Sequence, residues 1–229
     1  MHEAVILAGG YGTRLRQVVA DVPKPMAPIS GRPFLEIQLE MLDRKGVGHA
    51  VLAVGYLGHM IIEHFGDRFG NLELSYTTES SPLGTGGAMQ RALQHCRSDR
   101  VFVLNGDTYL DFDFDAADRL WQPDHRGIIV ARTVPDTSRY GRLAVADGWV
   151  HGLVEKGAGG EGVINAGCYV LNRGQLADFD VPPPFSFEND YLARLLPSSP
   201  FHLFVAEGLF IDIGVPEDFA RAQSLLAGV

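Results

Sequence analysis

The sequence predicts an α/β fold in which helices flank a mixed, mainly parallel sheet. Short apolar segments of strand length alternate with longer segments whose apolar residues recur every three or four positions, as on one face of a helix. The connections between these segments are short in the first half of the chain. After about residue 115 the segments become short strands, which indicates that antiparallel strands extend the sheet.

In the first half of the chain, apolar strands and amphipathic helices alternate. The expected strands are residues 4–7, 50–54, 72–77 and 101–104, and the expected helices are residues 34–45, 60–65 and 86–95. This order is typical of a doubly wound sheet.

The second half is expected to contribute strands at residues 128–133, 142–146 and 150–155. Asp147-Gly148, between the last two of these strands, is a hairpin turn signal. A helix is expected at residues 216–227, because proline begins it and acidic residues follow in its first turn.

Two segments of the second half have the composition of surface loops. Residues 157–162 are mostly glycine, and residues 182–184 are three consecutive prolines, which cannot continue a helix. We interpret both as loops within one domain of residues 1–229.

Composition excludes several classes of protein. The chain has 229 residues, of which 46% are hydrophobic, so it can bury a sizeable core. Its 28 acidic and 19 basic residues give a net charge of −9, which disfavours binding to nucleic acid or to an anionic membrane. The longest apolar runs are far shorter than the roughly 18 residues of a membrane span. The start lacks a cationic segment followed by an apolar core, so we expect no signal peptide.

The cysteines and histidines suggest no metal site. Cys96 and Cys168 lie far apart in the sequence and are expected to be reduced thiols, as in a cytoplasmic enzyme. The eight histidines form no cluster of ligands. We assign no function to either residue type.

A glycine-rich loop follows the first expected strand. The strand end and the loop contain Leu7, Ala8, Gly9, Gly10, Gly12 and Thr13. Glycines at this place let backbone N–H groups approach a ligand closely, and such loops often hold phosphates. Arg14 adds a cation. The alternative is a tight turn with solvated basic side chains.

Two familiar nucleotide-binding motifs do not fit this loop. The phosphate loop of ATPases needs lysine and then serine or threonine after its last glycine, whereas Thr13 and Arg14 follow Gly12. The dinucleotide motif needs a third glycine where Leu15 stands. An ATPase and a dehydrogenase are therefore both poor matches.

Two aspartates are candidate ligands for Mg²⁺. Asp107 follows the strand at 101–104 through Asn105-Gly106, and a carboxylate at a strand's carboxyl end is well placed to hold Mg²⁺ together with phosphate oxygens. The alternative there is an ordinary Asx turn. Asp212 lies among apolar residues, where an unpaired charge would be costly, and a cation is the simplest compensation.

A second glycine-rich segment, Gly84-Thr85-Gly86, precedes the helix expected at 86–95. Thr85 is a candidate N-cap, and the glycines leave room for a flat base. Glu79, just upstream, could accept hydrogen bonds from the N–H groups of guanine. The alternative for Glu79 is an exposed surface glutamate.

Residues 7–15, followed by Pro23-Lys24-Pro25-Met26, closely resemble the sugar-1-phosphate nucleotidyltransferase family. Within it, residues 18–19, 21–28 and 82–88 look most like the D-glycero-D-manno-heptose 1-phosphate guanylyltransferases. The resemblance implies a Rossmann-like nucleotide-diphospho-sugar transferase fold. It also implies transfer of a nucleoside monophosphate, from GTP by the closer resemblance, to a sugar 1-phosphate, with release of pyrophosphate.

The resemblance also implies roles for individual residues. Arg14 would steady the pyrophosphate, Lys24 would offset charge at the transferred group, and Asp107 and Asp212 would hold Mg²⁺. The nucleotide half, about residues 1–115, would bind through Leu7, Ala8, Gly9, Gly10, Gly12, Thr13, Glu79, Gly84, Thr85, Gly86 and Gly106.

The sugar-phosphate half, about residues 116–229, would bind through Lys156 to the phosphate and through Glu155 to sugar hydroxyls, with Asn165 and the Gly141 backbone completing the pocket. Taken alone, a Glu-Lys pair is common at strand ends, and Asn165-Ala166-Gly167 could be a bulge. Where the family usually has a lysine this chain has Asn189, and Ser186 could cap a helix.

Two alternatives remain open. The enzyme could use mannose or glucose 1-phosphate with another nucleotide, or the chain could be a non-catalytic sensor of nucleotide sugars. In each case the expected partners are small molecules, with neither nucleic acid nor membrane, and the sequence does not indicate the oligomeric state.

Overall fold

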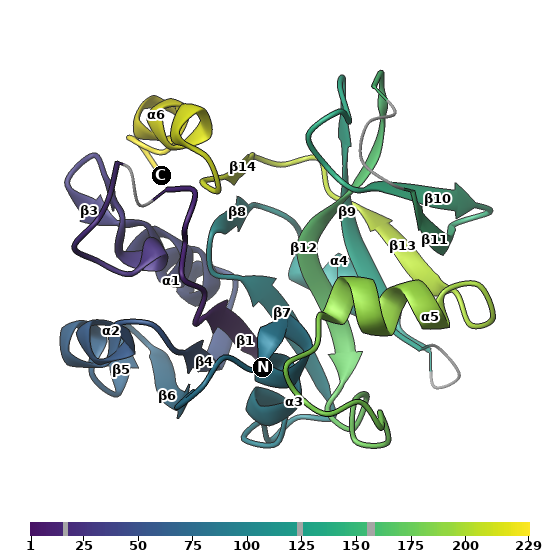
Figure 1. Ribbon diagram of the computed structural model, residues 1–229, viewed down its shortest axis with the longest axis horizontal. Helices are drawn as coiled ribbons and strands as arrows, with labels where there is room; N and C mark the ends of the chain where they lie inside the picture. Colours follow the sequence, from purple (N-terminus) through teal and green to yellow (C-terminus); the bar gives the residue numbers. More distant parts are fainter. Residues whose placement is uncertain (16–17, 123–125, 155–158) are drawn as a thin grey trace.

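A ten-stranded mixed sheet forms the centre of the computed structural model, which describes residues 1–15, 18–122, 126–154 and 159–229. The strand order is β10-β11-β13-β9-β12-β7-β1-β4-β6-β5, which Figure 1 allows the reader to follow. The strands are β1 (His2–Ala8), β4 (Val47–Val54), β5 (Arg68–Phe69), β6 (Leu72–Thr78), β7 (Arg100–Asn105), β9 (Ile128–Val134), β10 (Arg142–Ala146), β11 (Trp149–Val154), β12 (Gly162–Asn172) and β13 (Phe201–Val205). The predicted mixed α/β sheet is confirmed.

The first half of the chain forms the parallel part of the sheet, β7-β1-β4-β6. Ala4 of β1 pairs with Ala50 of β4 on one side and with Phe102 of β7 on the other. Three of these strands, β1, β4 and β7, are largely apolar and buried because helices cover both faces of the sheet. The helices α1 (Phe34–Arg44) and α2 (Gly58–Phe65) pack on one face and α3 (Gly84–Leu93) packs on the other, as the predicted alternation requires.

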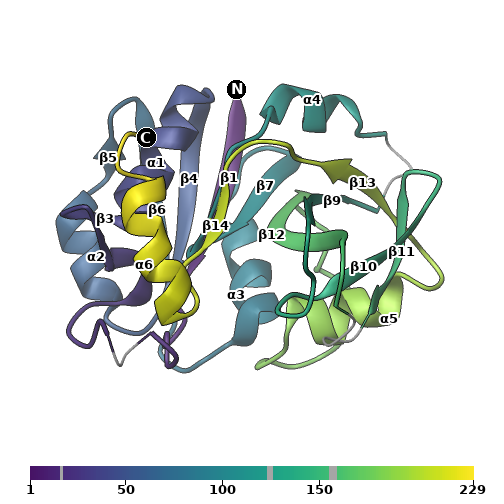
Figure 2. The same ribbon diagram turned by 90° about the horizontal axis from the view of Figure 1, so that it is seen from above.

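The second half adds strands that pair antiparallel, except β13, which runs parallel to β9. Figure 2 shows the parallel strands on the left and these strands on the right. Antiparallel pairing is therefore more extensive than the sequence indicated. The central strand here, β12, was not predicted, because its register shifts between Asn165 and Cys168, and Gly167 has a φ of +69°. The bulge proposed at Asn165-Ala166-Gly167 is confirmed.

The predicted hairpin joins β10 and β11. Asp147 and Gly148 have φ values of 50° and 80°, and two consecutive positive φ angles are typical of a type I′ turn. The prolines at 182–184 are exposed, as expected for a surface loop. The glycine-rich loop ends earlier than predicted, because Gly162 already belongs to β12, and its residues 157–158 lie outside the described part of the chain.

The remaining elements lie between these strands or follow the last of them. They are η1 (Lys24–Met26), β2 (Pro28–Ile29), β3 (Arg32–Pro33), β8 (Thr108–Leu110), α4 (Phe114–Arg119), η2 (Phe187–Leu192), α5 (Ala193–Leu195), β14 (Phe210–Asp212) and α6 (Pro216–Leu225). Ser186 caps η2 by accepting a hydrogen bond from the Asn189 N–H, which confirms its predicted capping role. The C-terminal helix α6 begins at Pro216, as predicted.

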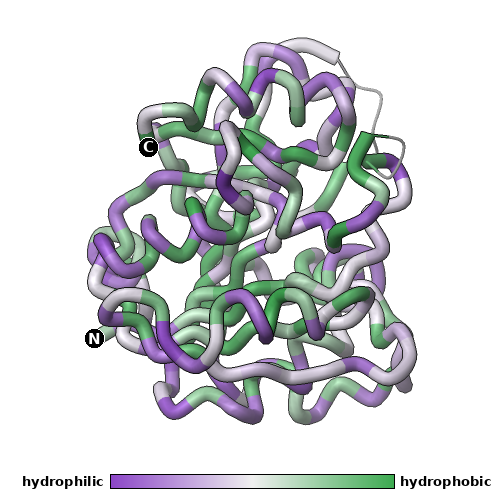
Figure 3. The backbone as a smooth tube through the Cα atoms, turned by 90° about the vertical axis from the view of Figure 1, so that its left-hand side faces the viewer, coloured by the Kyte–Doolittle hydropathy of each residue, from purple (hydrophilic) through white to green (hydrophobic). Residues whose placement is uncertain are grey.

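Two apolar clusters stabilise the sheet, one on each face. One contains Ile6 with α1, α4 and α6, and the other contains Val5 with α3 and η2. In Figure 3 hydrophilic and hydrophobic stretches alternate along peripheral helices, as amphipathic packing requires. Cys96 and Cys168 are both buried thiols without a disulfide. No helix among the described residues is long and apolar enough to cross a membrane.

Candidate active site

The carboxyl ends of the four parallel strands surround a cavity of about 520 Å³, the first cavity. The residue directly after each strand lines it: Gly106 after β7, Gly9 after β1, Gly55 after β4 and Glu79 after β6. The predicted nucleotide and catalytic residues among its lining are Leu7, Ala8, Gly9, Gly10, Lys24, Glu79, Gly84, Thr85, Gly106 and Asp107. This is the edge at which α/β sheets bind ligands.

Glycine is required where these strand ends approach one another. A Cβ atom at Gly55 would lie 2.7 Å from the Gly9 carbonyl oxygen, and one at Gly106 would lie 2.7 Å from the Leu7 carbonyl oxygen. Gly12 has a φ of +58°, and a Cβ there would lie 2.9 Å from the Lys24 Cβ. The glycine-rich loop therefore packs directly on Lys24.

Three predicted nucleotide residues, Gly12, Thr13 and Gly86, do not line the first cavity. A Cβ at Gly86 would lie 2.2 Å from the Phe185 ring. The missing side chain at this position therefore accommodates the packing of Phe185 on α3.

Glu79 lies at the wall of the first cavity and is partly buried, so the alternative of an exposed surface glutamate does not describe it. Its Oε2 accepts a hydrogen bond of 3.1 Å from the Leu83 N–H. Burial raises the pKa of Glu79, and the Leu83 N–H and the charge of Arg91 only partly oppose this. The carboxylate is an acceptor that a ligand in the cavity can reach.

Two tyrosines that sequence reasoning missed also line the first cavity. The rings of Tyr11 and Tyr56 lie 5.4 Å apart, centroid to centroid. Tyr11 is half exposed. Each directly follows a glycine just beyond the carboxyl end of a strand, Tyr11 after β1 and Tyr56 after β4, and this position was the signal in the sequence.

A second cavity, of about 990 Å³, shares Asn105 and Asp107 with the first. Its lining includes the predicted residues Arg14, Gly141, Asn165 and Asp212. It also includes residues to which the sequence analysis gave no binding role, among them Arg139, Tyr140, Glu188, Asn189 and Asp218. The two cavities therefore meet at Asp107.

The four predicted catalytic side chains converge at this junction. Strand β14 pairs with β8, so Asp212 lies opposite Thr108 and beside Asp107. Lys24 forms an ion pair with Asp107. A Cβ at Gly214 would lie 2.8 Å from an Asp212 carboxylate oxygen, 3.3 Å from the Lys24 Nζ and 3.4 Å from a guanidinium nitrogen of Arg14, so all these groups crowd around Gly214.

The two carboxylates share a site in which negative charge is unfavourable. Burial, and then the charge of Asp107, raise the pKa of Asp212 to about 6. Lys24, the Gly214 N–H and Arg14 oppose this shift without cancelling it. Among the described residues, no group of three or more His, Cys, Asp or Glu gathers around a potential metal site, so any cation here would rest on Asp107, Asp212 and the substrates.

Gln38 of α1 holds the turn that carries Asp107. Its buried amide donates to the carbonyl oxygens of Asn105 and Thr108, at 3.0 and 3.1 Å. These two hydrogen bonds bracket Asp107 and restrict its backbone. Sequence reasoning missed this residue, although a glutamine on the apolar side of a helix was a signal.

In the second cavity the structure brings together two of the predicted sugar-phosphate residues. The Asn165 N–H donates to the Gly141 carbonyl oxygen at 3.3 Å. Glu155 and Lys156 lie outside the described residues. Arg139 is a cation at this cavity, and it donates to Asp218 of α6 at 2.6 Å, with the Asp218 side chain only 5% exposed.

Thr85 does not cap α3 as predicted. The helix begins at Gly84, with Leu83 at the N-cap position. The Thr85 hydroxyl instead accepts a hydrogen bond from the Phe187 N–H and donates one to Glu188, both of 2.9 Å. A tertiary contact with η2 therefore takes the place of the local cap.

Comparison with known proteins places this site in context. A model of the family described as nucleotidyl transferase matches residues 3–227. The D-glycero-alpha-D-manno-heptose 1-phosphate guanylyltransferases of Aneurinibacillus thermoaerophilus and Campylobacter jejuni are 36% and 38% identical to this chain, over 98% and 95% of it and over 98% and 96% of their own lengths. The crystal structure of HddC from Yersinia pseudotuberculosis complexed with GMP-PN matches with a TM-score of 0.88 and 39% identity, over 98% of this chain and 99% of that one.

Proposed function

Because this chain belongs to the nucleotidyl transferase family, we propose that it transfers a nucleoside monophosphate from a nucleoside triphosphate to a sugar 1-phosphate and releases pyrophosphate. The substrates we propose are GTP and D-glycero-alpha-D-manno-heptose 1-phosphate, after the names of its relatives. The observation that carries this proposal is the meeting of two cavities at Arg14, Lys24, Asp107 and Asp212.

The first cavity, built mainly from residues 1–115, would bind the nucleotide. Its glycine-rich wall brings backbone N–H groups close to the triphosphate. Glu79 would accept hydrogen bonds from the N–H groups of guanine, which uracil does not present in that arrangement. Tyr11 and Tyr56 supply an aromatic surface beside the same cavity.

The second cavity, built mainly from residues 116–229, would bind the sugar 1-phosphate. Asn165 and the backbone of Gly141 lie side by side there, and Arg139 supplies a cation. We assign Lys156 to the sugar phosphate and Glu155 to sugar hydroxyls, as the resemblance to the family implies.

The Asp107 and Asp212 pair fits Mg²⁺. Carboxylate oxygens are hard ligands, and Mg²⁺ in proteins usually takes one or two carboxylates together with substrate phosphates. The raised pKa of Asp212 indicates that this pair lacks sufficient positive charge. When bound, Mg²⁺ would neutralise and orient the reacting phosphates.

In the reaction, an oxygen of the sugar phosphate forms a bond to the α-phosphorus while the bond from that phosphorus to the pyrophosphate oxygen breaks. The second pKa of a phosphate monoester is about 6, so the nucleophile is already a dianion at neutral pH and needs no general base. Lys24 would offset charge at the transferred group, and Arg14 would steady the departing pyrophosphate. The protein thus contributes alignment and charge neutralisation.

Two other functions remain as alternatives. A mannose or glucose 1-phosphate with another nucleotide would use the same chemistry. A non-catalytic sensor would bind nucleotide sugars without turnover, and the convergence of all four catalytic groups argues against it. We propose a cytoplasmic location, which two buried thiols without a disulfide support.

The test is Mg²⁺-dependent pyrophosphate release from GTP, ATP, CTP, UTP and dTTP, each paired with heptose, mannose and glucose 1-phosphates. We expect turnover with GTP and the heptose. Turnover with a different pair alone would keep the reaction and change the substrates. Tight binding of nucleotide sugars without any pyrophosphate release would favour the sensor.

A further inference from the structure

Glu188 of η2 connects the two cavities. It lines the second cavity, while its Oε2 accepts a 2.9 Å hydrogen bond from Thr85, which lines the first. The Ser186 hydroxyl donates to the same oxygen at 3.1 Å. The other oxygen, Oε1, accepts a hydrogen bond of 3.2 Å from the Tyr169 hydroxyl. The two oxygens of this carboxylate therefore begin two hydrogen-bonded paths, the Thr85 branch toward the first cavity and the Tyr169 branch toward the second.

The branch through Tyr169 ends at Asn165. The Asn165 Nδ2 donates to the Tyr169 hydroxyl oxygen at 2.8 Å, and the Asn165 Oδ1 accepts from the Gly167 N–H at 3.1 Å. Tyr169 is fully buried, and burial followed by the charge of Glu188 raises its pKa well above the usual value, so it remains a neutral O–H donor.

The direction of this chain of hydrogen bonds is set at Glu188. An ionised carboxylate only accepts, so the Tyr169 hydroxyl must donate to it and is left to accept from the amide of Asn165. A glutamine at 188 could present its NH₂ group to Tyr169 instead. The chain would then reverse, and the Asn165 amide would have to rotate to offer its oxygen.

We propose that Glu188 is a positioning residue that orients the Asn165 amide toward the sugar 1-phosphate and ties it to Thr85 beside the nucleotide. This inference rests on the proposed function, because it assigns the second cavity to the sugar 1-phosphate. It gives Glu188 a role without direct contact with the reacting atoms. Glu188 thereby fixes the position of the sugar 1-phosphate site relative to the nucleotide site.

The test compares steady-state kinetics of Glu188→Gln, Tyr169→Phe and the double variant with wild type. We expect each single variant to raise KM for the sugar 1-phosphate about tenfold, the effect of one hydrogen bond to a charged group. The double variant should raise it no further, because both changes interrupt the same chain. For Tyr169→Phe, kcat and KM for GTP should stay within about twofold of wild type, since the Thr85 branch is intact.

Ser186→Ala is the matched control. It removes the N-cap of η2 and one of the donors to Glu188, while the chain to Asn165 remains. We expect a lower Tm with KM for the sugar 1-phosphate unchanged. An equal rise in KM for this variant would show that any loosening of η2 has the same effect, and would overturn the positioning role.

Additive effects in the double variant, or an unchanged KM in either single variant, would also overturn the role of Glu188. If Glu188→Gln does not fold, Tyr169→Phe against Ser186→Ala decides the matter, because Tyr169→Phe keeps the buried ring. Wild-type protein without pyrophosphate release would overturn the proposed function itself and this extension with it. If the wild type releases pyrophosphate but the effects of the two substitutions on KM add in the double variant, only the positioning role of Glu188 would be overturned.

Discussion

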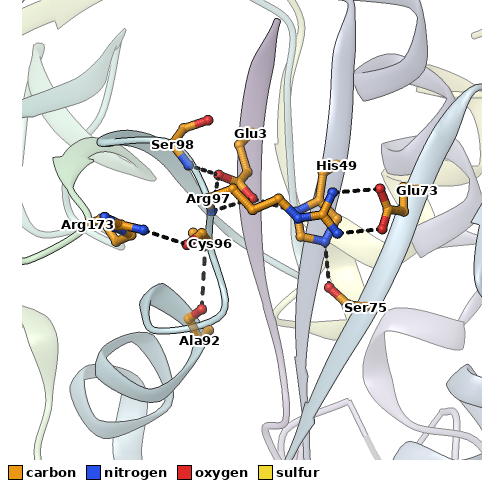
Figure 4. A network of polar contacts seen from close by, with 9 residues as sticks. All are labelled: Glu3, His49, Glu73, Ser75, Ala92, Cys96, Arg97, Ser98 and Arg173. Atoms are coloured by element: carbon orange, nitrogen blue, oxygen red, sulfur yellow. Dashed lines mark hydrogen bonds and ion pairs between the residues drawn. The ribbon is translucent and has the colours of Figure 1, made fainter.

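Polar groups at the two ends of the parallel strands β1, β4 and β6 differ in their surroundings: at one end they bond to one another, and at the other they face open cavities. At the amino end, Figure 4 shows Glu3, His49, Ser75, Glu73 and Arg97 joined in one network of hydrogen bonds and ion pairs. At the carboxyl end lie the two cavities, where acidic and basic groups crowd around open space. The same strands therefore support a closed network at one end and an open site at the other.

The amino-end network satisfies its buried carboxylate. Glu3 is 3% exposed, and it accepts hydrogen bonds from the His49 ring at 2.5 Å, the Arg97 N–H at 2.9 Å and the Ser98 N–H at 2.7 Å. Burial alone would raise the pKa of Glu3, but these hydrogen bonds outweigh burial and lower it. None of these residues lines either cavity of the site.

At the carboxyl end the shift has the opposite sign, because burial and Asp107 together raise the pKa of Asp212. A buried carboxylate whose oxygens accept enough hydrogen bonds stabilises the fold. One with too few hydrogen bonds and too little positive charge around it destabilises the fold and is available to a ligand. We therefore expect substitutions at the amino end mainly to affect stability, and substitutions at the carboxyl end mainly to affect turnover.

The largest effect is expected for Glu3→Ala. It removes the centre of a buried network and should lower the free energy of unfolding by about 3–5 kcal/mol, measured by urea denaturation. Because the pKa of Glu3 is lowered, this stabilisation is complete above pH 4.5 and is lost as the pH falls through the folded-state pKa below it. Turnover per folded molecule should not change, and a loss of turnover as large as that of Lys24→Ala would contradict the comparison.

Next in size is Lys24→Ala, which should lower kcat at saturating substrates by at least about 100-fold, the scale for a preorganised charge. The same loss is expected for Asp107→Ala. Lys45→Ala is the matched control, since Lys45 also pairs with an aspartate, Asp111, but lines neither cavity. Near-normal turnover of Lys24→Ala would refute the role we propose for it.

A smaller effect on stability, opposite in sign to that of Glu3→Ala, is expected for Asp212→Asn. The folded protein binds this proton more tightly than the unfolded chain, so ionised Asp212 reduces stability increasingly as the pH rises from 3.8 to about 6. The variant should therefore have a higher Tm than wild type at pH 8, by about 2–4 °C for each kcal/mol gained in the free energy of unfolding. Its turnover should be lost. The gain in Tm should shrink below pH 6, and a lower Tm at pH 8 would show that the ionised carboxylate is stabilised after all.

The smallest effect is expected for Arg97→Ala. The Arg97 side chain pairs with Glu73 at 2.6 and 2.8 Å, but both side chains are exposed, and the backbone N–H of Arg97 remains to hold Glu3. We expect almost no change in the urea midpoint, and none at about 1 M salt. A loss comparable to that of Glu3→Ala would mean that the ion pair, not the buried carboxylate, stabilises this end.

Features that depend on neighbouring residues could be predicted from the sequence alone. The alternation of strands and helices, the Asp147-Gly148 turn and the glycine-rich loop follow from periodicity and from backbone preferences of single residues. Asp107 was placed correctly at the end of a strand because its position relative to that strand is encoded locally.

Contacts between segments that are distant in the sequence could not be predicted and appear only in the folded chain. The pairing of β14 with β8 places Asp212 beside Asp107, and Gln38 of α1 holds the turn that carries Asp107. Thr85 bonds to η2 instead of capping α3. Strand β12 escaped prediction because its bulge breaks the period of two. Such contacts depend on how whole elements pack against one another, and no short stretch of sequence contains the residues on both sides of that packing.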